Sequence, residues 1–346
     1  MFLEIKKRIE KSIHAYLNEV NATYKLRKIS PVLYRNIKEF ISRKGKRIRP
    51  TLFVVGYLGF TDKPAPRLYR SAVSIELLHD FMLVHDDIID KSDTRRGKPS
   101  MHAMMQEYLK GYADIKFSGA DLTIVVGDIM YAMALDAFLA IEEDRRRKEL
   151  ALKKLIEAAF LTGSGEFIEL LLSTKEIGEI EKSDIYRIYD LKTANYTFAA
   201  PLTMGAILGG AGEKEIQRLS SYGIYLGRAF QIKDDIIGTF GEESETGKSN
   251  VTDLQEAKKT LLVWYAYNHS GRKNKALIKN TFSKEKVNKN DLLIMRGIIS
   301  DSGALEYARS EIKKLGELAV DTLRNSSIKE KYKKSLSFFS EEILAL

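Results

Sequence analysis

Apolar side chains recur every three and four residues along nearly the whole chain, and this spacing constrains the fold more than any other feature. Residues 69–90 give the clearest example, because their apolar positions share one broad helical stripe: Tyr69, Ala72, Val73, Leu77, Phe81 and Val84. The same period marks residues 121–142, 150–172, 215–238 and 253–268, whereas alternating strand patterns are nearly absent. The pattern predicts an all-α protein, a single large helical bundle of about ten or more helices.

The composition supports this expectation and excludes several kinds of site. Only 6 of the 346 residues are Pro, which suits long helices. Because Cys is absent, disulfides, thiolate metal sites, Fe–S clusters and cysteine nucleophiles are all excluded, and a reducing compartment is expected. With 5 His, a His-rich metal site is disfavoured. No stretch resembles a linker, so one domain over residues 1–346 is expected.

The chain has a net charge of +9, which would suit an anionic partner such as a nucleic acid, a membrane surface or a phosphorylated small molecule. Its charges are mixed along helix faces, however, as at 142–149 and 329–334, so solubility alone would also account for them. Residues 193–212 carry no charge, but their polar groups and Pro201 predict a buried helix pair. No basic helix or aromatic platform suggests nucleic-acid binding. We expect a cytoplasmic protein without a membrane span.

A first acidic motif, His85–Asp90, ends the apolar helix that begins near Tyr69. Asp86 and Asp90 are spaced i, i+4, so both carboxylates extend from one helix face. Two like charges near a helix C-terminus cost stability unless a cation neutralises them. Oxygen ligands without Cys select a hard ion, Mg²⁺ before Zn²⁺. A solvated helix end is the alternative reading of such a motif.

A second acidic pair, Asp234 and Asp235, again follows an apolar helix. If the two motifs face each other across a helical bundle, they would hold Mg²⁺ ions, and Mg²⁺ commonly bridges a few carboxylates to phosphate oxygens. The expected ligand is therefore a diphosphate. Cations that could complement it flank the acidic motifs, at 45–50, 93–97, 192–193, 246–248 and 258–260.

These motifs together resemble the trans-isoprenyl diphosphate synthases of the polyprenyl synthetase family, most closely the archaeal-type geranylgeranyl diphosphate synthases. The resemblance runs from about Lys44 to Ala308. Its motifs occur in order: GKRIRP, HDFMLVHDDIID, DTRRGKPS, GD at 127–128, KTANY, GRAFQIKDDIIG, TGK and AKKTL. The resemblance implies an all-α bundle around a central cavity, of the isoprenoid synthase type, and a homodimer.

The resemblance also implies residue roles. Asp86, Asp90 and Asp234 would bind the metal, about three Mg²⁺ ions per site, with Asp87 and Asp235 nearby. Two sets of residues would bind the substrates: Arg95, Lys192, Thr193, Gln231, Lys248 and Lys258 hold the allylic diphosphate, and Lys46, Arg49, His79 and Arg96 hold isopentenyl diphosphate. His79 could instead be an ordinary core residue. Lys192 and the aspartates of both motifs are the expected catalytic residues.

The implied reaction is an ionisation, condensation and elimination that joins isopentenyl diphosphate to an allylic diphosphate. Phe81 and Met82 are the expected chain-length residues, because Phe81 lies roughly 7–8 Å along the helix from the aspartates and its ring would stop a growing tail. That position predicts geranylgeranyl diphosphate as the product, although Phe81 could also be ordinary core. The alternatives are a farnesyl or longer-chain synthase, or a non-catalytic regulatory subunit.

Three positions depart from the family pattern. Gly238 stands where the second motif often has a last Asp, and Lys44 replaces the first Gly of the usual GGKR string. The helix motif that is often GQ..D reads Gly165, Glu166, Phe167, Ile168, Glu169, so the roles of Glu166 and Glu169 stay open.

Overall fold

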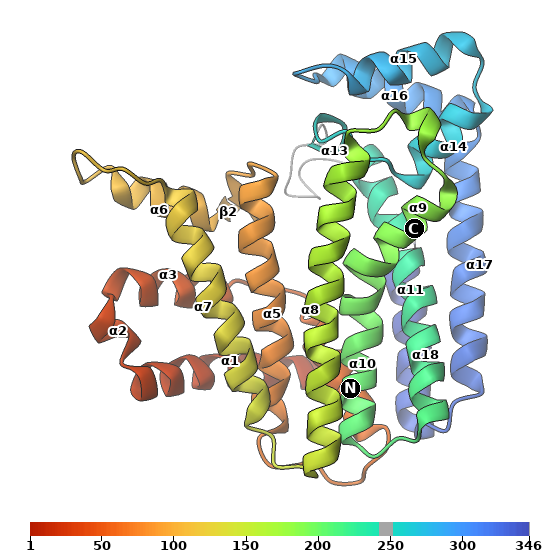
Figure 1. Ribbon diagram of the computed structural model, residues 1–346. Helices are drawn as coiled ribbons and strands as arrows, with labels where there is room; N and C mark the ends of the chain where they lie inside the picture. Colours follow the sequence, from red (N-terminus) through yellow and green to blue (C-terminus); the bar gives the residue numbers. More distant parts are fainter. Residues whose placement is uncertain (242–251, 346) are drawn as a thin grey trace. The chain divides into compact units, whose positions relative to one another are not determined.

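The computed structural model describes residues 1–241 and 252–345, and in these ranges the regular elements are helices apart from one hairpin of two short strands (Figure 1). The predicted all-α class is therefore confirmed. The chain divides into two compact units, residues 1–155 with 201–211 and residues 156–200 with 212–346. The expectation of one domain over 1–346 stays a prediction.

The first unit is built on the pairing of α5 (Leu68–Ile89) with α7 (Gly119–Leu139). Its other elements are α1 (Phe2–Tyr24), α2 (Leu26–Ile29), α3 (Pro31–Ile41), α4 (Ile48–Leu58), the hairpin β1 (Thr94–Arg95) and β2 (Lys98–Pro99), α6 (Met101–Leu109), the start of α8 (Arg145–Ser173) and most of α10 (Ala200–Leu208). A continuous row of buried residues on α5, from Ser71 to Leu78, explains why this helix lies at the centre of the unit.

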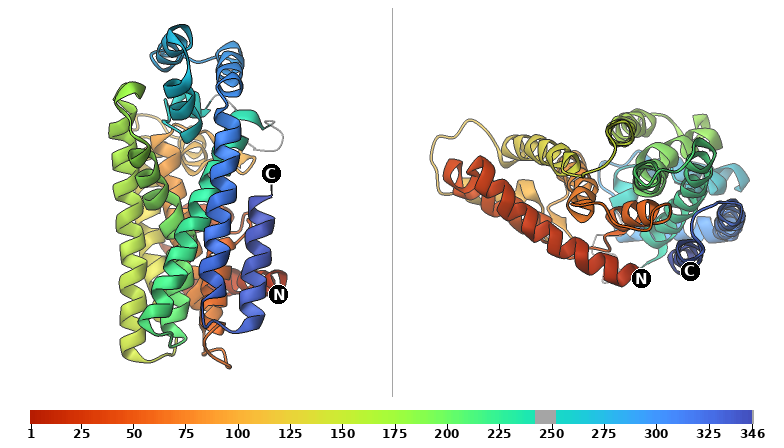
Figure 2. Two further views of the ribbon diagram at one scale, coloured as in Figure 1. Left: turned by 90° about the vertical axis from the view of Figure 1, so that its right-hand side faces the viewer. Right: turned by 90° about the horizontal axis from the view of Figure 1, so that it is seen from below.

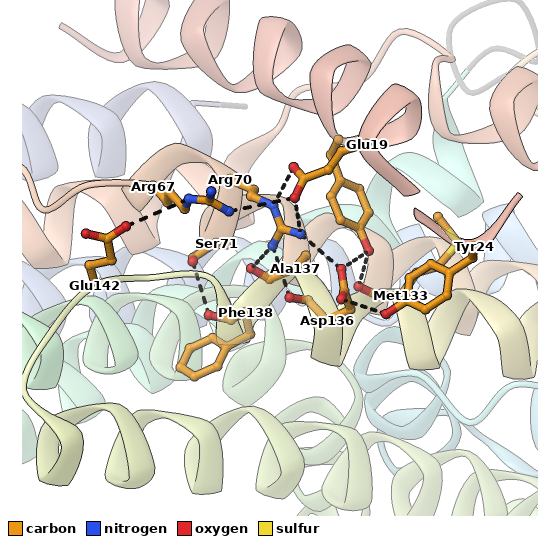
Figure 3. A network of polar contacts seen from close by, with 11 residues as sticks. Glu19, Tyr24, Arg67, Arg70, Ser71, Met133, Asp136, Ala137, Phe138 and Glu142 are labelled. Carbon is orange, nitrogen blue, oxygen red and sulfur yellow. Dashed lines mark hydrogen bonds and ion pairs between the residues drawn. The ribbon is translucent and has the colours of Figure 1, made fainter. Parts of the chain in front are cut away.

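A polar network fastens α1 to α5 and α7 (Figure 3). The Arg70 guanidinium donates to Glu19 of α1 and to Asp136 of α7, at 2.9 and 3.1 Å. The Tyr24 hydroxyl donates to the same Asp136 carboxylate, at 3.1 Å. Three helices thus share one carboxylate, which fixes their relative positions within this unit.

The second unit is built around α11 (Glu213–Phe240), which packs against α17 (Ala304–Arg324) and a π-helical segment, η2 (Asp190–Ala199). Figure 2 shows α17 and α18 (Glu330–Leu344) side by side. The remaining elements are the later part of α8, the short 3₁₀ turn η1 (Ile177–Glu179), α9 (Lys182–Tyr189), α13 (Thr252–Gln255), α14 (Leu261–His269), α15 (Arg272–Phe282) and α16 (Lys289–Asp301).

Two glycines allow η2 to approach α11 closely. A Cβ on Gly227 would lie 2.4 Å from the Cα of Ala194, and one on Gly223 would lie 2.5 Å from the Cα of Ala199. Any larger residue at either position would force the two segments apart. This contact places Lys192 and Thr193 of η2 beside the helix that carries the second acidic motif.

Helix α7 is long and apolar enough to cross a membrane, the one such helix among the described residues. Only length and composition support that reading, and the core helix of a soluble protein passes the same test. Here α7 packs against α5 and α6, with 44% of its most apolar window buried. The uncharged stretch 193–212 lies instead in η2 and α10, and Phe198, Leu202 and Ala206 are fully buried.

Candidate active site

The first acidic motif lies at the C-terminal end of α5, as the sequence predicts. Asp90 is the residue that ends the helix, and its N–H donates to the carbonyl of Asp86, at 2.8 Å. Carboxylate oxygens of Asp86 and Asp90 come within 4.8 Å of each other, and both side chains are partly exposed. Two oxygens at this separation can be bridged by one hard cation, so the donor set fits Mg²⁺.

Asp87, between these two residues, has a different environment. Its side chain is fully buried, and its Oδ1 accepts from Nε of Arg95, at 2.7 Å. The Arg95 guanidinium also lies 3.7 Å from an Asp86 carboxylate oxygen. Asp87 is therefore neutralised inside the protein, which leaves the partly exposed Asp86 and Asp90 as the pair that can reach a ligand.

Arg95 and Arg96 belong to a tight hairpin. Arg96 and Gly97 connect β1 to β2, with φ of 57° and 70°. Two successive positive φ values define the type I′ turn of two-residue hairpins, which usually takes Asn-Gly. The hairpin places Arg95 inside the protein and Arg96 outside it, at the tip.

The hairpin is anchored from α3 and the residues after it. The Arg43 guanidinium donates to the backbone carbonyls of Arg95 and Pro99, at 3.3 and 2.8 Å. Glu39 of α3 accepts from Arg43 and from Lys98. The turn is thus held by hydrogen bonds to the backbone of both strands and by the Lys98–Glu39 ion pair.

The basic motif before α4 contains cations in two environments. Arg47 is buried and its guanidinium donates to Glu76 and Glu10, so this cation stabilises the unit and is unavailable to a ligand. Lys46 and Arg96 are both exposed, and neither makes a hydrogen bond or an ion pair with any residue in the described ranges. A Cβ on Gly45 would lie only 3.3 Å from the Arg96 guanidinium, so Gly45 lets Arg96 lie against this motif.

His79 lies on α5, close to these cations. Burial lowers the pKa of its imidazole well below the ordinary value, and Arg49 and Arg96 lower it further. His79 is therefore neutral near pH 7, and it can donate or accept a hydrogen bond without adding charge. Arg49, His79 and Arg96 of the predicted isopentenyl diphosphate site thus lie together in the first unit, and the exposed Lys46 belongs to the same sequence motif as Arg49.

The expected chain-length residue Phe81 faces α7. Its ring centroid lies 5.2 Å from that of Tyr131 and 4.8 Å from that of His85. His85 in turn donates to the carbonyl of Ile124, at 3.2 Å, across Gly127. A Cβ on Gly127 would come within 2.3 Å of the His85 ring, which explains a glycine at this place in the GD motif. Met82, like Phe81, is partly buried.

In the second unit, Lys192 lies in η2 and pairs with both carboxylates that the sequence left without a role, Glu166 and Glu169. The two glutamates are one helical turn apart on α8, so they present their carboxylates to one cation. A π-helical segment inside a helix often marks a functional site.

A chain of hydrogen bonds links three of the predicted motifs of this unit. Thr193 donates to Gln231, at 2.6 Å, and the Gln231 amide donates to Asp235, at 2.9 Å. The Tyr189 hydroxyl donates to the other oxygen of Asp235 and accepts from the backbone N–H of Leu261, at 3.1 Å. Burial and the adjacent Asp235 raise the pKa of Tyr189 well above its usual range, so it remains a neutral donor.

The second acidic motif repeats the pattern of the first. Asp235 is buried and bonded within the protein, whereas Asp234 is exposed on α11. Lys258 lies 2.6 Å from the carboxylate of Glu256. Lys248 and the TGK motif lie outside the described residues.

Several residues at these sites were not predicted from the sequence. Tyr131 and Tyr189 contact predicted residues from other helices, and no local pattern marks such tertiary contacts. Glu166 and Glu169 pair with Lys192. The sequence signal for this pairing was their spacing of three residues, which places both carboxylates on one helix face.

The helical fold and the two aspartate pairs, one at the end of α5 and one within α11, are those of the isoprenoid synthase class. The sequence profile described as polyprenyl synthetase matches residues 30–295. A geranylfarnesyl diphosphate synthase of Aeropyrum pernix is 35% identical over 288 residues, which cover 82% of this chain and 84% of the relative. A geranylgeranyl diphosphate synthase of Saccharolobus solfataricus is 28% identical over 94% of this chain and 96% of its own.

A solved geranylgeranyl pyrophosphate synthetase of Pyrococcus horikoshii superposes with a TM-score of 0.84, at 27% identity, over 100% of this chain and 98% of its own. The chain therefore belongs to the polyprenyl synthetase family and is a trans-prenyltransferase.

Proposed function

We propose that this protein condenses isopentenyl diphosphate with allylic diphosphates and releases geranylgeranyl diphosphate as its main product. The observation that carries the proposal is the Asp86–Asp90 pair at the end of α5, with the Arg95–Arg96 hairpin directly after it. Relatives named as geranylgeranyl diphosphate synthases support the same product.

Asp86 and Asp90 would hold Mg²⁺ on the first motif, and the exposed Asp234 would do so on the second. The metal would supply Lewis-acid stabilisation of the negative charge that develops on the leaving diphosphate. Lys192, Thr193, Gln231, Lys248 and Lys258 are proposed to hold the allylic diphosphate with Arg95, and Lys46, Arg49, His79 and Arg96 to hold isopentenyl diphosphate.

The protein's own residues would then orient the two substrates and exclude water. Cationic side chains fix the diphosphates so that the double bond of isopentenyl diphosphate faces the allylic carbon, and a proton is finally lost to the departing diphosphate. Apolar side chains along α5 and α7 would line the path of the tail, with Phe81 against Tyr131 as its stop. That the two acidic motifs act on one diphosphate stays a prediction.

A geranylfarnesyl product is the second candidate, because the Aeropyrum pernix relative with that name shares 35% of its residues with this chain. A non-catalytic regulatory subunit is disfavoured, since the Asp86–Asp90 pair is intact and accessible. We also propose that the protein is a cytoplasmic homodimer. Helix α7 supports an interface between copies, because Ile124, Val125 and Leu139 are exposed on it.

The test is incubation with labelled isopentenyl diphosphate, Mg²⁺ and each allylic starter in turn, followed by sizing of the products. We expect a main product of four isoprene units and no turnover after removal of the metal with EDTA. Restoration of activity by Mg²⁺ controls for damage by the chelator. Full activity in excess EDTA would contradict the metal assignment, and absence of any condensation with every starter would contradict the proposed function.

A further inference from the structure

In the second unit, a lysine proposed to bind the allylic diphosphate is paired with a glutamate that has no assigned role. Nζ of Lys258 lies 2.6 Å from Oε2 of Glu256, and a single residue separates the two in the chain. Both carboxylate oxygens of Glu256 are buried, whereas the Lys258 side chain is 27% exposed. No hydrogen bond reaches either oxygen from the described residues, so the ion pair with Lys258 has to offset the cost of burying the carboxylate.

The backbone between the two side chains is strained. Ala257 has a φ of 51°, a left-handed conformation that favours glycine and costs energy for a residue with a Cβ. Its N–H donates to the carbonyl of Leu254, at 3.1 Å. Such a conformation persists where the surrounding structure holds it, and residues in this state cluster at functional sites.

Hydrogen bonds fix both ends of the segment that carries the pair. At its start, the Gln255 amide donates to the carbonyl of Glu285, at 2.7 Å, and its oxygen accepts from the N–H of Val287, at 2.8 Å. At its end, the N–H of Leu261 donates to the hydroxyl of Tyr189, at 3.1 Å. The same tyrosine donates to the second acidic motif, so the segment is tied to α11 as well.

Lys259 anchors the segment from the interior of the unit. Its side chain is buried, and its ammonium donates to the carbonyls of Ala257 and Ser173, at 3.0 and 3.4 Å. The same ammonium lies 4.4 Å from the centroid of the Phe282 ring. The two adjacent lysines therefore differ, because Lys259 ties the strained backbone to the end of α8, whereas Lys258 is partly exposed and held by Glu256.

We propose that Glu256 is a positioning residue, which holds the ammonium of Lys258 in place for the diphosphate of the allylic substrate. The inference rests on the proposed function, because it takes Lys258 to be one of the residues that bind this diphosphate. An ammonium has three N–H groups, so it can pair with a carboxylate and a phosphate at the same time. Since the carboxylate is buried and the segment anchored, the lysine side chain is ordered before the substrate arrives, which lowers the cost of binding.

The experiment compares the wild type with Glu256→Gln in steady-state assays with Mg²⁺. The allylic starter that the wild type uses best is varied at saturating isopentenyl diphosphate, and isopentenyl diphosphate is then varied at saturating starter. We expect the KM for the allylic starter to rise about three- to tenfold, because the substrate itself must then order Lys258. The KM for isopentenyl diphosphate should not change. A loss of stability alone would not raise one KM and spare the other.

A double-mutant cycle asks whether Glu256 acts through Lys258. Lys258→Gln should raise the KM for the allylic starter, and Glu256→Gln should add little to that rise when both changes are combined. Additive effects or an unchanged KM in Glu256→Gln would overturn the inference. So would a lower KM, which would mean that Glu256 holds Lys258 back from the substrate. If the wild type condenses isopentenyl diphosphate with no starter, the proposed function fails, and the inference fails with it.

Glu311→Gln is the matched control in the same unit. The Glu311 side chain is 14% exposed, against 18% for Glu256, and it pairs with Lys182 at 3.0 Å. Neither member of that pair is a proposed substrate residue, so both KM values should match those of the wild type. A rise in the KM for the allylic starter in this variant as well would make the effect unspecific and would overturn the inference.

A second variant covers the case in which Glu256→Gln does not fold. Glu256→Asp keeps the negative charge on a shorter side chain, which must draw the ammonium of Lys258 back or lose it. In either case we expect the KM for the allylic starter to rise at least about threefold, with no change in the KM for isopentenyl diphosphate. Wild-type values of both constants would contradict a positioning role for Glu256.

Discussion

At the scale of single residues, the two acidic motifs divide their aspartates in the same way. Asp86 and Asp234 are accessible, whereas the next residues, Asp87 and Asp235, are buried and held by partners in their own unit. The sequence alone makes the members of each pair look equivalent. Their difference arises from tertiary contacts with Arg95 and Tyr189, so only the structure separates the accessible aspartate of each pair from the buried one.

This division predicts that substitutions at the two neighbouring aspartates have different effects, one on stability and the other on turnover. Asp87→Asn removes the hydrogen-bonded counter-charge of the buried Arg95 and leaves it only the more distant Asp86, so we expect a loss of about 3 kcal/mol in unfolding free energy. Asp86→Asn removes an accessible charge, so it should change stability by less than about 0.5 kcal/mol while reducing turnover by orders of magnitude. Urea unfolding followed by circular dichroism, together with product assays, measures both. Equal destabilisation by the two substitutions would contradict the division.

At the scale of elements, the helical period located the major helices, and the i, i+4 spacing correctly placed Asp86 and Asp90 on one face. The sequence was less informative about the burial and the ion pairs of individual side chains. In the motif at 45–50 it offered three equivalent cations, yet Arg47 is buried in an ion pair while Lys46 is exposed. The π-helical form of η2, which packs closely against Gly223 and Gly227, was also not predicted from the sequence.

The contact between Phe81 of α5 and Tyr131 of α7 leads to a prediction about the length of the product chain. Phe81→Ala removes the ring that packs on Tyr131, so a tail could extend further between these helices, and we expect products longer by one or more isoprene units. Thin-layer or liquid chromatography of the dephosphorylated products measures the change. Tyr34→Ala is a control on α3, which should leave the product length unchanged. An unaltered product profile for Phe81→Ala would refute the role of Phe81 as a stop.

At the scale of the whole molecule, each unit assembles its own set of predicted residues. The first unit holds the Asp86–Asp90 pair with the Lys46, Arg49, His79 and Arg96 site, and the second holds the network of Thr193, Gln231 and Asp235. Motifs far apart in sequence could be assigned to one reaction because they resemble a family. Their grouping into units could not be predicted, since the chain between them lacks any linker-like stretch.

The proposed homodimer gives a prediction at this scale. A copy of the chain has a mass of 39.3 kDa, so we expect a particle of about twice that mass in analytical ultracentrifugation. Val125→Lys places a charge on the exposed apolar face of α7, where Val125 is 55% exposed, and should shift the protein toward the monomer. Lys153→Glu on α8 is an exposed control for the change in charge. A wild type that sediments as a monomer at all concentrations would contradict the proposal.

The hairpin tip has a consequence for attempts to make this enzyme more heat-resistant. Asn is the residue that a type I′ turn prefers at the position of Arg96, so a survey of favourable turn residues would recommend that exchange. The exchange would relieve backbone strain and remove a cation from the proposed isopentenyl diphosphate site in the same step. We therefore expect Arg96→Asn to give a more stable protein that binds isopentenyl diphosphate more weakly, which makes this loop a poor target for stabilisation.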